Sequence, residues 1–260
     1  MKQEETLRED VAAGRNAVME LLKSGREIDA IYVRQGPAEG SLKAILAKAR
    51  QQGVMVKQVS GEKLDQLSGG VNHQGVAAVL SAAEYTTLEE ILRRAQQAGH
   101  PPFLVLCDEI QDPHNLGAIL RTAEACGVDG VILPKRRSAG LNQTVYKTSA
   151  GAAAVVPVCR VSNLAQTVRS LKKQGIFFYC AQMGGVDWCQ VDYSGGACLI
   201  VGNEGKGVNR LLLEEADVLV GLPMLGQVNS LNASVAAGVL LYEMARQRLG
   251  KPAKNPAGSQ

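Results

Sequence analysis

The sequence has few aromatic residues and no clustered metal ligands. Phe, Trp and Tyr make up 4% of its 260 residues, so an aromatic platform for stacking nucleic-acid bases is not expected. The six cysteines include no C-x-x-C pair, and the three histidines are scattered along the chain. That spacing offers no metal site. We expect a protein without a bound metal, whose thiols are reduced and buried.

Long apolar runs and a strong charge imbalance are also missing. No stretch approaches membrane-spanning length, and no apolar segment of the signal-peptide type opens the chain. The formal net charge is +3, which permits a nucleic-acid partner without requiring one. Together with 46% hydrophobic residues, these features predict a globular, cytoplasmic protein with no membrane segment.

The first part of the chain has the pattern of a small α/β unit, which we place at residues 12–82. It ends in a polar, glycine-rich loop, residues 68–75, followed by an apolar strand. The segment 83–102 carries a charged helix and closes with Gly-His-Pro-Pro, which is typical of a linker. Helices are expected at 14–23 and 42–49, and strands at 30–33, 54–56 and 76–80.

Residues 103–250 predict a second α/β domain. Continuous apolar strands alternate there with helices, which indicates a parallel sheet covered on both faces. The ends of the chain, residues 1–11 and 251–260, are expected to be tails. Strands are expected at 103–106, 131–133, 155–158, 176–180, 198–201 and 218–222, and helices at 116–126, 164–174, 208–215 and 233–249.

Polar residues where the predicted second-domain helices begin suggest a functional site. Asn115 opens a predicted helix and could be its N-cap or a ligand group. Arg121 follows on the same helix and could pair with Glu124, three residues on, or serve the site. Before the last helix, the segment 229–234 holds four Asn and Ser residues, more than capping alone explains.

A glycine-rich turn follows the predicted strand 198–201. Residues 202–207 have the pattern G-x-x-G-x-G, which is neither the dinucleotide fingerprint nor the P-loop. This argues against a nucleotide-dependent oxidoreductase. Glu204 places a carboxylate in that turn, at the edge of the sheet where ligands bind α/β proteins.

The three segments resemble, in order and spacing, the motifs of the SpoU-type RNA ribose methyltransferases of the SPOUT class. Residues 112–121 correspond to the first motif, 202–207 to the second and 230–236 to the third. The first unit, from Gly14 to Gly75, is similar to the substrate-binding domain of the RlmB subgroup, which methylates a guanosine ribose in 23S rRNA.

This resemblance implies a SPOUT-type second domain, with a parallel sheet and a trefoil knot, and an L30e-like α/β RNA-binding domain before it. It also implies a homodimer, S-adenosylmethionine as cofactor, and RNA, specifically 23S rRNA, as substrate. Two alternatives stay open: a tRNA or other rRNA 2′-O-methyltransferase of the same family, and a non-catalytic RNA-binding or ribosome-assembly protein.

The motifs also imply site residues. Arg121 would act as the base, or would clamp an RNA phosphate and steady the charge that develops on the hydroxyl. RNA contacts are expected at the glycine-rich loop and at the basic cluster after strand 131–133. The catalytic set implied is Asn115, Arg121, Glu204, Ser230 and Asn232; the cofactor set is Gly202, Leu222 and Leu231; the RNA set is His73, Gln74, Lys135, Arg136 and Arg137.

Overall fold

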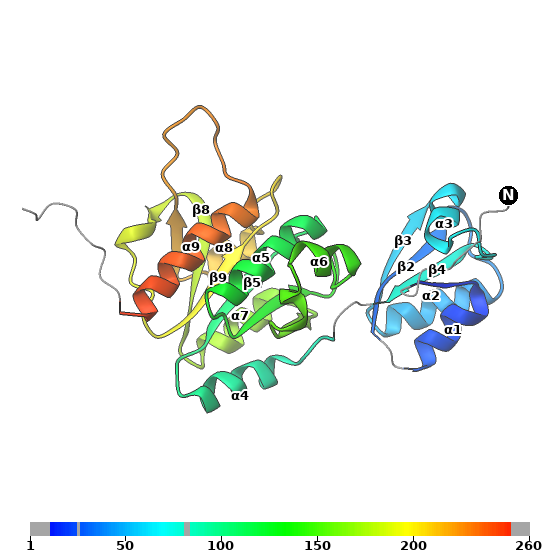
Figure 1. The fold of residues 1–260 in the computed structure, drawn as a ribbon, viewed down its shortest axis with the longest axis horizontal. Coiled ribbons are helices and arrows are strands. Elements are labelled where there is room, and N and C mark those ends of the chain that lie inside the picture. Colours follow the sequence, from blue (N-terminus) through cyan, green and yellow to red (C-terminus); the bar gives the residue numbers. More distant parts are fainter. Residues whose placement is uncertain (1–10, 25–26, 81–83, 251–260) are drawn as a thin grey trace, which may run out of the picture.

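The structure is a computed structural model that describes residues 11–24, 27–80 and 84–250. The chain forms two units, each with its own sheet and its own core (Figure 1). The tails expected at 1–11 and 251–260 lie outside the described residues, except for residue 11. No helix in the described part of the chain is long and apolar enough to cross a membrane.

The N-terminal unit is a mixed four-stranded sheet with the order β1-β4-β2-β3. Strand β4 is buried along its whole length and pairs antiparallel with both β1 and β2. Strand β1 and helix α3 were not expected, because each is too short to show a clear period. The elements are β1 (Val11–Ala13), α1 (Arg15–Ser24), β2 (Ile28–Arg34), α2 (Ser41–Gln51), β3 (Met55–Val59), α3 (Gly61–Ser68) and β4 (Val76–Leu80).

The C-terminal unit contains a six-stranded sheet with the order β10-β8-β9-β5-β6-β7, and every pair in it is parallel. This confirms the parallel α/β sheet predicted from the apolar runs. From β5 the chain adds β6 and then β7 on one side. The strands β8, β9 and β10 all lie on the other side of β5. The strands are β5 (Phe103–Cys107), β6 (Gly130–Pro134), β7 (Val158–Val161), β8 (Ile176–Asp187), β9 (Gly196–Val201) and β10 (Val218–Gly221).

Helices cover both faces of this sheet. On one face, α5 and α9 pack on each other and on alternate sheet residues such as Val105 and Leu199. On the other face, α4, α7 and α8 cover the intervening residues, such as Leu104 and Ile200. This alternation is what a sheet with two covered faces requires. The helices are α4 (Leu88–Ala98), α5 (Pro113–Ala125), α6 (Gln143–Thr148), α7 (Leu164–Lys172), α8 (Arg210–Glu215) and α9 (Ala233–Arg248).

The strand expected at 155–158 is displaced, and this prediction was wrong. The chain instead makes a short 3₁₀ helix, Ala152–Ala154, which Gly151 enters at a φ of 89°. Val155 is 68% exposed, and β7 begins only at Val158. Pro157 has no N–H to donate to a ladder, so the apolar run could not be a strand from its first residue.

The parallel sheet determines where the polar loops gather. Since β9, β5 and β6 are neighbours, their carboxyl ends lie side by side at one edge. The loops that leave them are 202–209, 108–112 and 135–139. The strand order reverses beside β5, and the crevice at such a switch point is where open α/β sheets bind ligands.

Candidate functional site

A cavity of about 390 Å³ lies at this edge of the sheet. The turn after β9, the segment after β10 and the residues just before α9 line it together. Its size is within the range of small-molecule sites. Five of the residues singled out from the sequence line this cavity: Gly202, Glu204, Leu222, Ser230 and Leu231.

Gly202 is required by close packing of the turn on itself. A Cβ atom at this position would lie 2.4 Å from the backbone carbon of Gly207 and 2.4 Å from the nitrogen of Val208. No side chain tolerates such a contact, so the backbone itself forms this part of the cavity wall. A ligand there meets peptide groups rather than side chains.

Asn203 shapes the same turn, although it was not among the site residues predicted from the sequence. Its Oδ1 accepts hydrogen bonds from the backbone N–H groups of Gly205, at 2.9 Å, and Lys206, at 3.2 Å. Its backbone also exchanges two hydrogen bonds with Gly207. Asparagine is favoured in such turns because its amide substitutes for a backbone acceptor. That preference is the feature that could have identified it.

The first and third motifs meet through a single hydrogen bond. Nδ2 of Asn232 donates to Oδ1 of Asn115 over 2.9 Å, although the two residues are 117 apart in the sequence. Asn115 is buried, and its own Nδ2 donates to Asp112 at 3.3 Å. Asn115 is therefore not the N-cap of α5. Asp112 is that cap, and its side chain accepts from the N–H of His114.

Asn232 also begins α9. Its Oδ1 accepts from the N–H groups of Ser234, at 2.9 Å, and Val235, at 3.3 Å. One amide thus satisfies two of the helix's first donors with its oxygen and fixes Asn115 with its nitrogen. This side chain thus links the start of α9 to α5, in addition to their apolar packing.

Arg121 lies on α5 with its side chain exposed. It makes no hydrogen bond or ion pair with any described residue, so the surface pair with Glu124 is not formed. Arg121 is not among the residues that line the 390 Å³ cavity. Within one chain, its guanidinium faces solvent and is available to another molecule.

Asp108 directly follows β5 and is buried. Burial raises the pKa of its carboxyl, and the backbone N–H of Asn209, which donates to it at 2.6 Å, opposes that rise. The bond ties the end of β5 to the start of α8. Asp108 could not be singled out from the sequence, since a lone Asp after a strand is a common turn former.

The loop expected to contact RNA in the N-terminal unit is ordered by its own hydrogen bonds. Nε2 of His73 lies 3.1 Å from a carboxylate oxygen of Asp65, and Nδ1 accepts from the N–H of Gly75. Gln74 adopts a φ of 48°, and its backbone carbonyl accepts from Nε of Arg15 at 3.2 Å. The loop is therefore held in shape and presents Gln74 at the surface.

The basic cluster Lys135–Arg137 follows β6, next to the site edge. Arg136 and Arg137 line a groove of about 720 Å³ between the two units. Arg50 and Lys57 of the N-terminal unit lie on the same groove. This concentration of positive charge suits an anionic polymer.

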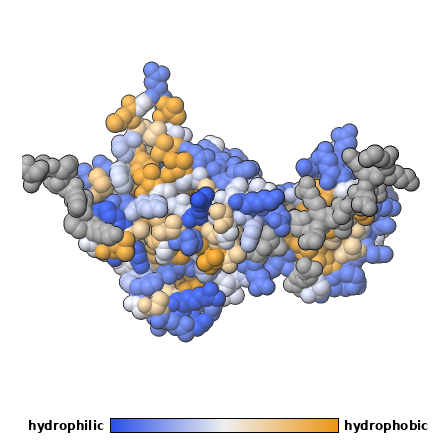
Figure 2. Space-filling model, viewed as in Figure 1, coloured by the Kyte–Doolittle hydropathy of each residue, from blue (hydrophilic) through white to orange (hydrophobic). Residues whose placement is uncertain are grey.

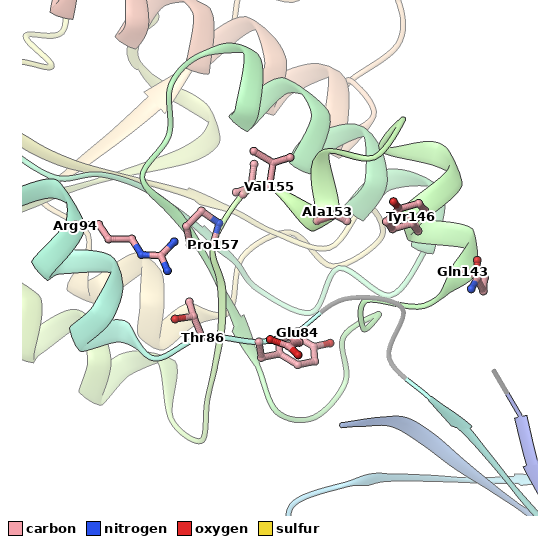
Figure 3. Close-up of a pocket in the computed structure, with 11 residues that line it drawn as sticks. Glu84, Thr86, Arg94, Gln143, Tyr146, Ala153, Val155 and Pro157 are labelled. Atoms are coloured by element: carbon pink, nitrogen blue, oxygen red, sulfur yellow. The ribbon is translucent and has the colours of Figure 1, made fainter. Parts of the chain in front are cut away.

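Another hollow, of about 550 Å³, lies between the segment after residue 83, α4 and the 3₁₀ turn (Figure 3). Tyr146, Val155 and Arg94 line it, and none of the residues singled out from the sequence does. It is therefore not the candidate site. Among the residues that the structure describes, no three His, Cys, Asp or Glu side chains come together in a way that could hold a metal ion.

Each of the two units matches a known protein-family model. Residues 102–242 match the family model described as the SpoU rRNA Methylase family. Residues 11–86 match the model described as RNA 2′-O ribose methyltransferase substrate binding.

Similar proteins cover most or nearly all of the chain. A protein of Bacillus subtilis named "Putative TrmH family tRNA/rRNA methyltransferase YacO" is 42% identical over 96% of this chain and 98% of its own. The solved AdoMet-bound rRNA methyltransferase from Sinorhizobium meliloti is 28% identical over 92% of this chain and 87% of its own, with a TM-score of 0.58. A TrmH/SpoU tRNA modifying enzyme of A. aeolicus is 32% identical over 63% of this chain and 85% of its own, with a TM-score of 0.54.

The double role of Asn232 leads to a test of stability. Asn232→Ala removes the cap of α9 and should lower the free energy of unfolding by about 1–2 kcal/mol. Asn232→Asp keeps a capping oxygen and should stay closer to the wild type. Urea unfolding followed by the fluorescence of Trp188, the only tryptophan in the chain, measures both. Equal stability of all three proteins would show that the amide does not hold α9.

Proposed function

The chain belongs to the SpoU rRNA methylase family, and from that premise we propose that this RNA methyltransferase transfers a methyl group from S-adenosylmethionine to a ribose 2′-hydroxyl, specifically of a guanosine in 23S rRNA. One observation carries the proposal. The structure brings Gly202, Glu204, Leu222, Ser230 and Leu231 from separate segments to one cavity.

The cavity is suited to S-adenosylmethionine. Its wall combines backbone groups of the turn at Gly202 with the apolar side chains of Leu222 and Leu231. Such a mixture fits a molecule with an aromatic base, polar edges and an aliphatic chain. When bound, S-adenosylmethionine supplies a methyl group on a sulfonium, which is a strong electrophile. The chain's own task is to exclude water and align the acceptor.

The side chains beside the cavity suit the ribose. Asn115 is fixed by Asn232 and by Asp112, so its amide cannot reorient freely. Ser230 lines the cavity and makes no hydrogen bond with any described residue, which leaves its hydroxyl available for substrate. Arg121, exposed on α5, would bind an RNA phosphate and stabilise the negative charge that forms as the 2′-hydroxyl loses its proton.

RNA recognition is assigned to the N-terminal unit and to the groove beside it. His73 and Gln74 would present a preformed loop, and Lys135, Arg136 and Arg137 would contact phosphates. A tRNA substrate is the second candidate, because the Bacillus subtilis relative is named for both RNA classes. The trefoil knot, the L30e-like character of the N-terminal domain, the division at residues 82 and 103 and the cytoplasmic location remain predictions.

A homodimer is proposed from an apolar stripe on α9. We define this stripe as Val235, Val239 and Tyr242 of α9 together with Leu231, just before the helix; in chain order from Leu231 they are 42%, 50%, 37% and 60% exposed. The segment between β10 and α9 projects beside it and carries Leu225 and Val228, both largely exposed. Figure 2 shows hydrophobic side chains gathered around this segment. So much exposed apolar surface favours a second copy of the chain.

The proposed reaction is tested by incubating the protein with S-adenosylmethionine that carries a tritiated methyl group. Unmodified transcripts of 23S rRNA and of tRNA are the acceptors. The label should enter 23S rRNA at one guanosine. The phosphodiester bond that follows this guanosine should resist alkaline hydrolysis, because its 2′-hydroxyl is blocked. Label in tRNA alone would select the second candidate, and label on a base would refute ribose methylation.

The same assay examines Arg121. Arg121→Ala should lower kcat by about 10²-fold or more, since it removes a group that acts on the transition state, and should leave the Kd of S-adenosylmethionine unchanged. Arg210→Ala, which removes an exposed arginine of α8, is the matched control and should retain activity. A normal kcat with only weaker RNA binding would mean that Arg121 has no catalytic role.

The dimer is tested by sedimentation at micromolar concentration. Val239→Glu puts a charge in the middle of the apolar stripe and should convert the dimer to a monomer. Leu211→Glu changes a 45% exposed residue of α8, on the opposite face of the sheet, and should leave the dimer intact. A monomeric wild type, or a dimer that tolerates Val239→Glu, would contradict this interface.

A further inference from the structure

We propose that Glu109 is a positioning residue for RNA binding: its carboxylate holds Arg137 so that the guanidinium meets a phosphate of the RNA beside the site. Glu109 follows β5, and Arg137 follows the neighbouring strand β6. The inference rests on the proposed function and adds a residue that no motif singled out.

Backbone geometry first draws attention to this pair. Among the described residues, only four other than glycine have a positive φ: Gln74, Glu109, Arg137 and Ala150. Two of these, Glu109 at 53° and Arg137 at 59°, form an ion pair with each other. The left-handed region is unfavourable for long side chains and is found at binding sites when the surroundings enforce it. A glycine would avoid the strain at either position, but it could not form the pair.

The two partners of the ion pair differ in solvent exposure. Nη1 of Arg137 lies 3.2 Å from Oε1 of Glu109. The Glu109 side chain is 24% exposed, whereas the Arg137 side chain is 77% exposed. This is the only hydrogen bond that the guanidinium makes with the described residues. Most of its five N–H donors therefore remain available for a phosphate.

The backbone around Glu109 is anchored from both sides. Its carbonyl accepts from Nδ2 of Asn203, in the cavity turn, at 3.0 Å. The carbonyl of the next residue, Ile110, accepts from the N–H of Ala139 at 2.7 Å and from the hydroxyl of Ser138 at 3.2 Å. The loops after β9 and β6 thus fix Glu109 between them. From this fixed backbone its side chain reaches Arg137.

The location links the RNA groove to the catalytic segment. Arg137 lines the groove between the units with Arg136. Glu109 lies three residues before Asp112, which begins α5 and binds Asn115. A phosphate held by Arg137 would therefore lie next to the loop that leads into the first motif. An exposed ion pair adds little to stability, so stability alone does not account for two strained residues.

A positioning role and simple electrostatics predict opposite changes in RNA affinity when the Glu109 carboxylate is removed. Removing a carboxylate from a basic surface raises the local positive charge and should strengthen RNA binding. If Glu109 positions Arg137, its loss should instead weaken RNA binding, because the guanidinium is no longer preorganised.

The experiment measures the Kd of an unmodified 23S rRNA transcript, and the KM and kcat for its methylation, at one salt concentration. Glu109→Gln should raise both the Kd and the KM for RNA about threefold to tenfold, with kcat and the Kd of S-adenosylmethionine within about twofold. Glu109→Gly relieves the left-handed backbone and removes the carboxylate, so the same loss there would exclude strain as the cause. Glu214→Gln, which removes an exposed carboxylate of α8, should leave RNA binding unchanged.

A double-mutant cycle separates this inference from the proposed function. Arg137→Gln and the double variant Glu109→Gln with Arg137→Gln should have equal Kd values for RNA, because Glu109 acts only through Arg137. Additive losses, unchanged or tighter RNA binding in Glu109→Gln, or an equal loss of S-adenosylmethionine affinity would each overturn the inference. A wild type that methylates no RNA would overturn the proposed function instead.

Discussion

The parallel arrangement of the six-stranded sheet is the constraint on which the site depends. In a parallel sheet all carboxyl ends lie on one edge, so segments far apart in the sequence deliver their polar groups to the same place. Here the turn at Gly202, the cap of α5 at Asp112 and the cap of α9 at Asn232 converge in this way. Apolar packing on both faces fixes the strands and therefore the loops.

Helix capping and the hydrogen bonds of the candidate site use the same side chains at this edge. Asn232 caps α9 with its oxygen and binds Asn115 with its nitrogen, so a single amide serves the fold and the site. Asp112 likewise caps α5 and binds Asn115. For Asn115 the sequence left a cap or a ligand group open, and the structure excludes the cap, because Asp112 caps α5. For Asp112 and Asn232, capping gives the side chain the rigidity that a site needs.

The sequence predicted what depends on periodicity and motif, and it failed where tertiary contacts decide. Apolar runs located five of the six strands of the large sheet. The strand expected at 155–158 was wrong, because Pro157 cannot donate to a ladder and β7 begins only at Val158. The motif residues that line the cavity were named from the resemblance to the methyltransferase motifs. Asn203 and Asp108 were missed, since their partners, Glu109 and Asn209, lie about 100 residues away. Arg121 was predicted to belong to the site, but the sequence did not show that it would make no hydrogen bond or ion pair with the described residues of its own chain.

A crystal structure of the protein with S-adenosylmethionine tests the central claim most directly. The account predicts that the ligand occupies the cavity formed by Gly202, Leu222 and Leu231, with its methyl group directed toward the side that holds Ser230 and Asn115. Ligand bound in another hollow, or an empty cavity in crystals grown with saturating ligand, would contradict it.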